Sequence, residues 1–315
     1  MEYATLGKTG IRVSRLCFGT LTISPLQANL PPEEARRVLL HAMRRGVNFF
    51  DCAELYGTYR VVGEAMRAWG EPIVVVGRSY AWTREGMQAS LYRALRELSR
   101  DYVDIFLLHE MESLANIRGH WEALEYLVEA KQEGLVRAVG ISTHHVEAVE
   151  AASAIDLIDI IHPLYNPLGI GIRGGSAEDM LAAIRTAARA GKGLYGMKVL
   201  AGGHLIHDAE NALKAVLAIP ELAAIAVGMQ SMVEVEFNTR VFSGQAVPEG
   251  LKVIARRASR RLHVEQWCRG CGECVAACRS QAIRMKRGRP LVDRGKCCFC
   301  GYCAAACPEF CIKVI

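Results

Sequence analysis

The sequence predicts an α/β protein: a (β/α)8 TIM barrel followed by a small, cysteine-rich α+β domain. Two observations lead to this prediction. Short apolar runs alternate with amphipathic helical patterns through the first 245 residues, and ten of the twelve cysteines lie after position 267. Eight strand–helix units in about 250 residues are the dimensions of such a barrel. We therefore expect the barrel in residues 1–245, a linking helix in 246–262, and the cysteine-rich domain in 263–315.

The barrel strands are expected where apolar residues run with little interruption, as in strands covered on both faces. These runs are 16–19, 48–51, 73–77, 103–109, 136–142, 156–162, 193–198 and 223–227. The segments between them have apolar residues at helical spacing. The expected helices are 31–45, 63–69, 83–98, 121–133, 145–154, 179–190, 208–217 and 232–241. A doubly wound sheet also alternates in this way, but the first strand is followed by Gly19-Thr-Leu-Thr-Ile, which is not a glycine-rich phosphate turn.

Polar side chains end several of the expected strands. The C-terminal ends of barrel strands form the mouth at which barrel enzymes carry their chemistry. Because the polar residues come from different strands, we expect them to converge on one site, with Tyr56 in the loop after the second strand. The residues at these ends are Asp51, Arg78, His109, Ser142, His162, Lys198 and Gly228.

Two cysteine runs of the same spacing mark the C-terminal domain. The pattern C-x2-C-x2-C-x3-C begins at Cys268 and again at Cys297. Bacterial ferredoxins hold two [4Fe–4S] clusters with this spacing, and the fourth cysteine of each run ligates the other cluster. The predicted ligand sets are Cys268, Cys271, Cys274 and Cys307 for one cluster, and Cys297, Cys300, Cys303 and Cys278 for the other.

Zinc and disulfides are the alternatives for these cysteines. Structural zinc sites also use paired C-x2-C elements, but zinc has no use for a third cysteine at the same spacing. Iron-bound and free thiols both favour a reducing compartment over a disulfide scaffold. Cys298 and Cys311 fall outside the ligand frame, and we interpret them as bystanders.

Composition and charge narrow the class of protein. Hydrophobic residues make up 51% and charged residues 23% of the chain, as in an ordinary globular enzyme. We expect no signal peptide and no membrane span, and hence a cytoplasmic protein. The net charge of +5 is concentrated between Lys252 and Lys296, where thirteen basic residues face three acidic ones. Two readings stay open: the cations offset the anionic clusters, or they dock an acidic redox partner protein. Without interleaved aromatic residues they do not indicate nucleic-acid binding.

Four stretches of the barrel resemble the aldo-keto reductase family. They are residues 1–20, 46–57, 98–109 and 139–142. Together with the cysteine runs, they make the chain similar to the aldo-keto reductases that carry a C-terminal dicluster ferredoxin domain. The resemblance implies reduction of a small carbonyl substrate with NADP(H) or NAD(H). It also implies that Asp51 is the buried carboxylate, Tyr56 the proton donor and His109 the residue that orients the carbonyl group.

The sequence departs from the family pattern at one catalytic position. Arg78 stands where the family has lysine. Arginine keeps the positive charge that makes a neighbouring phenol more acidic, but it does not give up a proton. Lys198, at the end of the seventh strand, is a candidate for a replacement ammonium.

The cofactor pocket implied by the resemblance matches the family only in part. Thr143 replaces a usual asparagine, His162 replaces a common glutamine, and Met197 lies where an aromatic ring often stacks on the nicotinamide. No basic residue precedes Arg240 in the phosphate-binding region, so NADP and NAD both stay open. The implied cofactor residues are Ser142, Thr143, His162, Lys198, Gly228, Gln230, Ser231 and Asn238.

The two halves handle electrons in different units. A nicotinamide passes two electrons as a hydride, whereas each [4Fe–4S] cluster passes one. Three hypotheses follow. The first is a nicotinamide-dependent carbonyl reductase that exchanges electrons through its clusters. The second is a nicotinamide-independent redox enzyme fed by the clusters, with a flavin as a further cofactor. The third is a non-catalytic electron-transfer subunit of a larger redox complex.

Overall fold

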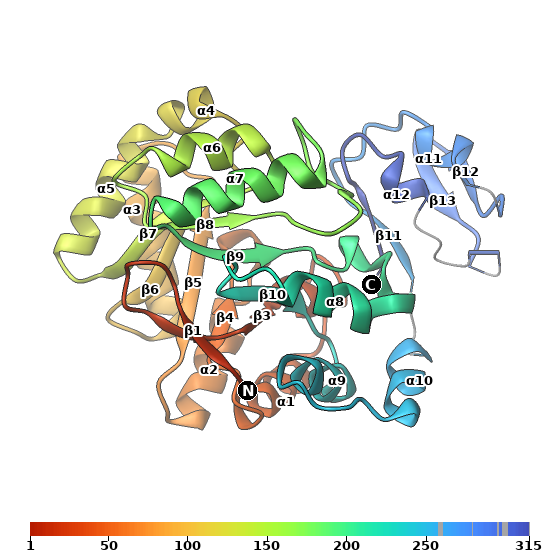
Figure 1. Ribbon diagram of the computed structural model, residues 1–315, viewed down its shortest axis with the longest axis horizontal. Helices are drawn as coiled ribbons and strands as arrows, with labels where there is room; N and C mark the ends of the chain where they lie inside the picture. The colour runs from red at the N-terminus through yellow and green to blue at the C-terminus, as the bar shows by residue number, and fades with distance from the viewer. Residues whose placement is uncertain (258–260, 279, 295, 298–301, 315) are drawn as a thin grey trace.

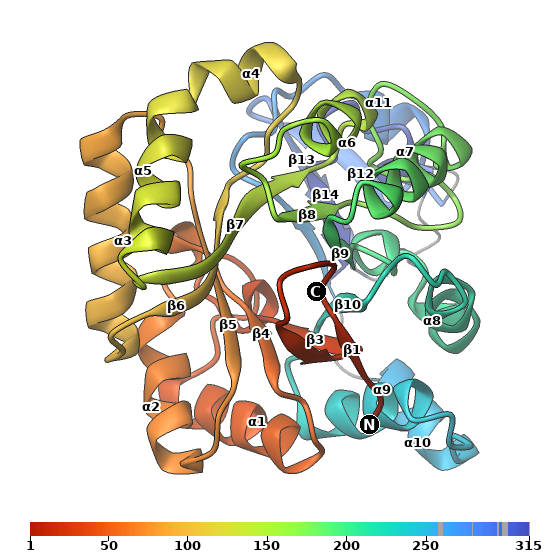
Figure 2. The same ribbon diagram turned by 60° about the vertical axis from the view of Figure 1, so that its left-hand side comes forward.

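Eight parallel strands close into a barrel in the order β10-β3-β4-β5-β6-β7-β8-β9, which confirms the predicted fold class (Figure 1, Figure 2). This computed structural model describes residues 1–257, 261–278, 280–294, 296–297 and 302–314. The barrel strands are β3 (Leu16–Gly19), β4 (Phe49–Asp51), β5 (Val74–Ser79), β6 (Val103–Leu108), β7 (Val136–Thr143), β8 (Ile160–Pro163), β9 (Gly193–Met197) and β10 (Ala224–Gly228).

Helices surround the strands (Figure 2). Those that follow the expected segments are α1 (Pro32–Arg44), α2 (Tyr59–Trp69), α3 (Arg84–Leu98), α5 (Trp121–Gln132), α6 (Val146–Ser153), α7 (Ala177–Arg189), α8 (Ala209–Leu217) and α9 (Met232–Phe242). A further short helix, α4 (Leu114–Gly119), precedes α5, and a 3-10 helix, η2 (Glu54–Tyr56), follows β4. Helix α10 (Glu249–Arg257) packs on α9 and adds Ala255 to the barrel's hydrophobic core.

Two of the expected starts lie four residues from those of the structure. Helix α2 begins at Tyr59, four residues before the predicted start, because the Val62 amide already donates to the Thr58 carbonyl. Strand β8 begins at Ile160 and not at 156. The preceding residues form a turn, in which the Ile158 amide donates to the Ile155 carbonyl, so their apolar side chains do not belong to a strand.

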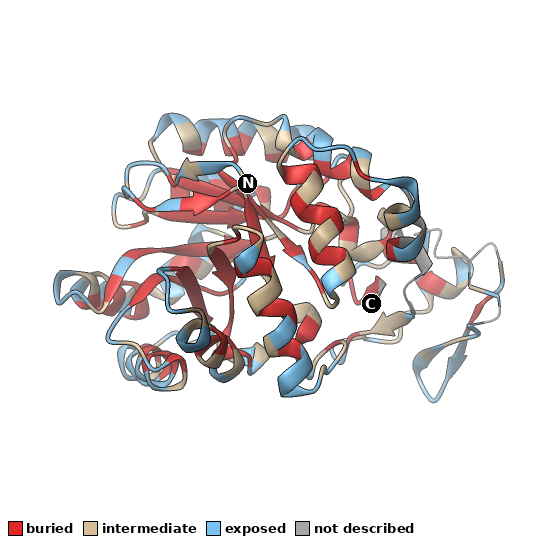
Figure 3. Ribbon diagram, turned by 90° about the horizontal axis from the view of Figure 1, so that it is seen from below, coloured by how far each residue is buried: buried red, intermediate tan, exposed pale blue. Residues whose placement is uncertain are grey.

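Alternation along the strands separates the barrel interior from the layer under the helices. Phe50 and Phe106 point outward into the core shared with the helices, whereas Phe49, Ile105 and Tyr195 point inward. Successive side chains of a strand face opposite sides, so every second residue reaches the interior. The strands are buried along nearly their whole length, as Figure 3 shows.

An N-terminal hairpin closes one end of the barrel. It consists of β1 (Tyr3–Thr5) and β2 (Arg12–Ser14), and Leu6 and Ile11 between them pack with the inward-facing residues. Gly7 lies against the start of β9: a Cβ atom there would be 2.4 Å from the Gly193 nitrogen, and its φ is +50°. Only glycine fits both conditions easily. The strands end at the opposite end of the barrel, which the hairpin does not cover.

The C-terminal region, residues 263–315, is called the cysteine module below. Strand β11 (Leu262–Val264) pairs with β14 (Ile312–Val314), and β12 (Ile283–Lys286) pairs with β13 (Arg289–Val292). Two short helices, α11 (Glu273–Ala276) and α12 (Tyr302–Ala305), carry cysteines of the two runs. Within the described residues, the helices are too short or too polar to cross a lipid bilayer.

Candidate active site

Strand alternation brings the predicted catalytic side chains to the end of the barrel opposite the hairpin. Asp51 and Arg78 continue the inward-facing positions of β4 and β5, and His162 does so on β8. His109 directly follows β6, and Tyr56 ends η2. All of these except His109 line one cavity of about 170 Å³, which we call the mouth cavity.

Arg78 connects the buried carboxylate to the phenol. Its Nη2 donates to Asp51 Oδ2 at 2.6 Å and to the Tyr56 oxygen at 3.0 Å, and its Nε donates to the Cys52 carbonyl at 3.3 Å. Arg78 and Asp51 are 2% and 4% exposed, so each needs the other's charge. The arginine thus contacts both the buried carboxylate and the phenol.

Tyr56 is arranged as a donor. Because Arg78 donates to the Tyr56 oxygen, the phenolic hydrogen stays available for another acceptor in the mouth cavity. Burial raises the pKa of Tyr56, and the nearby Arg78 charge only partly opposes this rise. Tyr56 therefore stays protonated at neutral pH, while Arg78 is in position to stabilise the phenolate that forms when the proton leaves.

His109 lies beside Tyr56 as a neutral imidazole. The ring centroids of Tyr56 and His109 are 6.0 Å apart in an edge-on arrangement, and Tyr80 stacks on His109 at 4.3 Å. Burial and the Arg78 charge hold the pKa of His109 well below its usual range. Its buried Nδ1 has no hydrogen-bond partner within the described part of the chain.

Tyr195 was missed by the sequence analysis. Its hydroxyl donates to Asp51 Oδ1 at 3.0 Å, so Asp51 receives one hydrogen bond from arginine and one from tyrosine. His162 stacks on Tyr195 at 3.8 Å, and its Nε2 is 3.9 Å from Asp51 Oδ1. Burial holds the pKa of His162 well below its usual range. The inward position of Tyr195, two residues before Met197 on β9, was the available signal.

Ser142 and Thr143 are fully buried and hydrogen-bonded to the backbone. The Ser142 hydroxyl oxygen accepts from the Glu110 amide at 2.9 Å, and the Thr143 hydroxyl oxygen accepts from the His145 amide at 2.8 Å. These bonds shape the turns that follow β6 and β7.

Lys198 lines the mouth cavity, but its ammonium bonds to His144 and not to the Tyr56 phenol. Its ammonium is 2.7 Å from His144 Nε2, and the residue has a left-handed φ of +58°. Burial lowers the pKa of Lys198 to about 8, although Glu110 and Glu265 act in the opposite direction. The positive charge bonded to Tyr56 is therefore that of Arg78.

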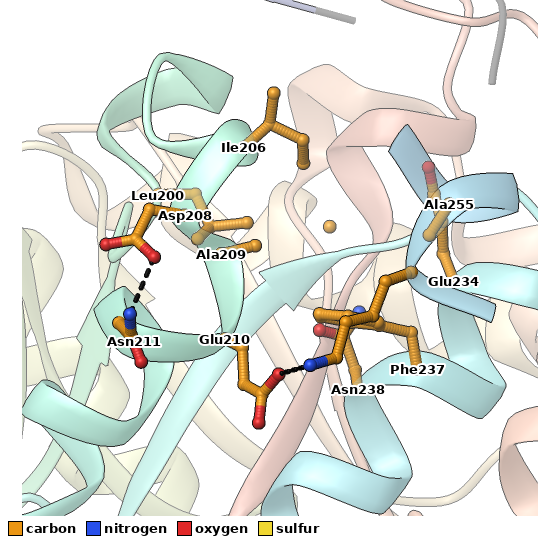
Figure 4. Close-up of a pocket in the computed structure, with 12 residues that line it drawn as sticks. Leu200, Ile206, Asp208, Ala209, Glu210, Asn211, Glu234, Phe237, Asn238 and Ala255 are labelled. Carbon is orange, nitrogen blue, oxygen red and sulfur yellow. Dashed lines mark hydrogen bonds and ion pairs between the residues drawn. The ribbon is translucent and has the colours of Figure 1, made fainter. Parts of the chain in front are cut away.

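A second cavity, of about 290 Å³, continues from the mouth cavity between α8, α9 and α10. Both cavities share Gly228 and Glu234 in their linings. Figure 4 shows Asp208 and Glu210 on one side of this acidic cavity and Glu234 and Asn238 on the other.

The hydrogen bonds in and beside the acidic cavity organise its lining. Lys252 donates to Glu210 at 2.8 Å, and Asn211 donates to Asp208 at 2.7 Å. Gln230 lines the mouth cavity, whereas Ser231 caps α9, its hydroxyl oxygen accepting from the Glu234 amide.

The cysteine module brings one predicted ligand set together. Cys268, Cys271, Cys274 and Cys307 line a single small cavity, and none of them forms a disulfide. The loop between the first three cysteines turns through two glycines with left-handed φ, Gly270 at +70° and Gly272 at +85°. Four thiols around one space fit a [4Fe–4S] cluster. In the other predicted set, Cys300 lies outside the described residues, as does Cys298.

The fourth cysteines of the two runs have equivalent surroundings. Cys278 Sγ accepts from the Ala282 amide, and Cys307 Sγ accepts from the Cys311 amide, both at 3.2 Å. Hydrogen bonds to ligand sulfur are among the features that set cluster potential. Cys311 therefore contributes its backbone amide beside the predicted ligand Cys307.

The cysteine module packs against the open end of the barrel. Leu164 and Met197 from the barrel form one hydrophobic cluster with Cys303, Phe310 and Ile312 from the module. His204 Nε2 is 3.1 Å from the Ile312 carbonyl, and Arg261 donates to the Gln27 carbonyl at 3.1 Å. The module therefore lies next to the mouth cavity.

Comparisons with known proteins agree with this architecture. The aldo/keto reductase family model matches residues 15–243, and the 4Fe-4S dicluster domain model matches residues 261–308. The oxidoreductase YrpG of Bacillus subtilis is 26% identical over 60% of this chain and 73% of its own length. L-galactose dehydrogenase of Arabidopsis thaliana is 26% identical over 76% of this chain and 87% of its own length.

A solved structure has the same fold. The holo form of aldo-keto reductase AKR11C1 from Bacillus halodurans superposes with a TM-score of 0.65 at 20% identity, over 82% of this chain and 96% of that one. The family match spans the strands that carry Asp51, Arg78 and His162, and the dicluster match spans both cysteine runs. The chain therefore belongs to the aldo/keto reductase family and carries a C-terminal 4Fe-4S dicluster domain.

Proposed function

We propose that the chain is an NAD(H)-dependent carbonyl reductase whose clusters exchange electrons with a redox partner. The observation that carries this proposal is the Arg78 guanidinium, which bonds Asp51 at 2.6 Å and Tyr56 at 3.0 Å. Because Arg78 is the donor in the bond to Tyr56, the phenolic hydrogen can point to another acceptor. The same bond places the positive charge of Arg78 next to the phenol oxygen.

The residues supply the proton half of the reaction. When bound, a reduced nicotinamide would supply a hydride to the carbonyl carbon. Tyr56 gives its proton to the carbonyl oxygen, and Arg78 stabilises the resulting phenolate until a proton from water restores it. His109, neutral and beside Tyr56, orients the carbonyl oxygen as a hydrogen-bond donor.

Acidic side chains support NAD(H) over NADP(H). Asp208, Glu210 and Glu234 line the cavity next to the mouth, and Lys252 there already bonds Glu210. A carboxylate suits the ribose 2′-hydroxyl of NAD, whereas a 2′-phosphate needs cations. We expect NADH to bind the anaerobic protein at least about tenfold more tightly than NADPH in a fluorescence titration. Glu210→Gln should narrow that difference, and a tighter NADPH complex in the unmodified protein would contradict the assignment.

Turnover tests the catalytic assignment. Tyr56→Phe should lower kcat for simple aldehydes by about 10²–10⁴, the range for a lost general acid. NADH affinity should not change, because the ring and its packing remain. If Tyr56→Phe reduces aldehydes at the unmodified rate, Tyr56 is not the proton donor.

We also propose that residues 1–245 are the reductase unit and the cysteine module is the electron carrier. The exposed basic residues Arg284, Lys286 and Arg287 on the β12–β13 hairpin suit an acidic redox partner. Salt should then weaken electron transfer from an acidic donor protein, and Lys286→Glu should weaken it further. No salt dependence would exclude charge steering at this hairpin.

A nicotinamide-independent redox enzyme is the second candidate. The packing of the cysteine module against the barrel mouth favours it, because clusters beside a pocket suit direct electron delivery. A spectrum of anaerobically purified protein separates the candidates. Flavin bands together with no NADH binding would support the second candidate and overturn the first.

A further inference from the structure

A third cavity, of about 530 Å³, lies between the barrel and the cysteine module. Tyr80, Glu110 and Arg173 line it from the barrel, and Trp267 and Phe310 line it from the module. Its volume is in the range of small-molecule sites. We call it the interdomain cavity. It is separate from the mouth and acidic cavities, in which the nicotinamide is proposed to bind.

Two lysines separate the interdomain cavity from the mouth cavity. Lys198 of the barrel and Lys313 of the module line both spaces, and Tyr56 lines the mouth cavity. A molecule in the interdomain cavity therefore contacts the lysine pair, Lys198 and Lys313, which also borders the mouth cavity that Tyr56 lines.

The lysine pair shares one aromatic ring. Lys313 Nζ is 3.0 Å and Lys198 Nζ is 5.2 Å from the Phe310 ring centroid, and Lys313 also donates to the Phe310 carbonyl oxygen. Lys313 is 5% exposed. Two ammonium groups brought together and buried are unfavourable without an anion. Burial, and after it the Lys198 charge, holds the pKa of Lys313 well below its usual range.

The nearby carboxylates are engaged by other groups. Glu265 is 3.2 Å from His263 Nε2, Glu110 accepts from the Tyr80 hydroxyl at 2.6 Å, and Glu309 is 3.4 Å from Arg269. They balance part of the lysine charge but do not bridge the pair. The lysine pair is thus placed to receive an anion from either adjacent cavity.

We propose that the interdomain cavity binds the substrate, and that the lysine pair holds a carboxylate on a carbonyl compound whose carbonyl oxygen faces Tyr56. This inference rests on the proposed carbonyl reduction. Glu110, Glu112 and Glu309 also line the cavity, so a singly charged carboxylate suits it better than a doubly charged phosphate. The cysteine module then completes the substrate site as well as carrying clusters.

A binding experiment tests the site without turnover. Butanoate, a singly charged carboxylate, is titrated calorimetrically into the anaerobic holoprotein, with uncharged butanamide as the matched probe. We expect Lys198→Gln and Lys313→Gln each to weaken butanoate binding at least about tenfold, an expected loss for one charged hydrogen bond. Lys8→Gln, which changes an exposed lysine at the hairpin end of the barrel, should change nothing. The intact cluster spectrum shows that each variant keeps its module, and Lys198→Gln alone decides if Lys313→Gln does not fold.

Turnover separates this inference from the function on which it rests. With 4-oxobutanoate and its methyl ester as substrates, Lys198→Gln should raise KM for the acid about tenfold and leave the ester unchanged. Lysine-dependent butanoate binding without reduction of either aldehyde would overturn the proposed reductase activity and keep the anion site. Reduction of both aldehydes with no effect of either lysine would overturn the anion site and keep the reductase. A Lys313→Gln protein whose only change is a shifted cluster potential would also overturn the anion site.

Discussion

The barrel buries large side chains in two layers, whereas the described part of the cysteine module buries few residues, three of which are cysteines. Tyr59, Tyr195 and Phe106 are completely buried in the barrel, while the described part of the module buries residues such as Cys274 and Ala304. A unit of about 50 residues rarely has a sufficient core of its own and usually needs a metal or disulfides. We therefore expect the two units to keep their shape by different means: the barrel by packing and paired charges, the module by cluster ligation.

Iron removal is the largest test of this difference. Because cluster ligation stands in for a core, we expect anaerobic chelation to unfold the module and leave the barrel folded. Limited proteolysis should then cut within residues 261–314, and calorimetry should keep the barrel transition. Cys274→Ser should reproduce the effect.

Cys311→Ser is the matched control for the ligand variant. Cys311 is equally buried in the module, but it offers Cys307 a backbone amide, which serine retains. A chelated module that still resists protease would mean that the module has a sufficient core without iron.

Arg78 tests the barrel side of the comparison. Arg78→Met leaves the Asp51 carboxylate buried without its cation, and we expect the free energy of unfolding to fall by about 3–5 kcal/mol. Calorimetry should show a lower barrel transition while the cluster spectrum stays the same. Arg78→Lys keeps the charge and should cost less.

The double variant Asp51→Asn/Arg78→Met removes both charges. It should recover most of the stability lost by Arg78→Met, because no unpaired charge stays buried. If Arg78→Met is as stable as the unmodified protein, the Arg78 charge is not needed to balance the buried Asp51 carboxylate.

The alternation of the barrel could be predicted from the sequence, and with it the convergence of Asp51, Arg78 and His162. Each strand has a fixed period of two, so the end of the strand determines which way its last side chain points. The contact of one Arg78 nitrogen with both Asp51 and Tyr56 could not be predicted, because it depends on the conformation of a long side chain.

Contacts between the two units were also outside the reach of sequence reasoning. Lys313 follows the last predicted ligand by six residues, and nothing in that spacing places it against Phe310 and Lys198. Its position depends on how the module docks. Lys198 itself was a candidate for the ammonium beside the phenol. In the structure it has a left-handed backbone conformation, and its ammonium bonds to His144.

His204 makes the junction of the two units sensitive to acid. It is buried, and burial lowers its pKa to about 4, whereas an exposed histidine titrates near 6.5. Between these values only the undocked state binds the proton, so docking loses stability as the pH falls from about 6.5 to about 4. The full loss is about 3 kcal/mol. The calorimetric transition of the module should therefore fall between pH 7 and pH 5.

His204→Gln removes this titration and keeps an amide donor for the Ile312 carbonyl. The transition of this variant should be nearly flat over the same pH range. An unmodified protein with a flat profile would show that docking does not depend on the neutral imidazole.

Lys198 gives the smallest expected effect, and it reports on the anion site between the two units. The pKa of Lys198 is about 8, so its ammonium is charged below that pH and is lost above it. For 4-oxobutanoate we expect kcat/KM to be constant up to about pH 8, then to fall and to level off about tenfold lower, as for Lys198→Gln. The charged or titratable groups around Lys198 are Glu110, Glu265, Arg78, His144 and Lys313.

The methyl ester and Lys198→Arg identify the group that titrates. The ester carries no charge for the ammonium to bind, so its kcat/KM should pass through pH 8 unchanged. Lys198→Arg keeps its charge at every pH used and should remove the fall for the acid. If the ester and the acid fall together, the titrating group acts on the carbonyl chemistry and not on the carboxylate. Lys198 would then act on the chemistry at the barrel mouth, and the proposed carboxylate site between the two units would be overturned.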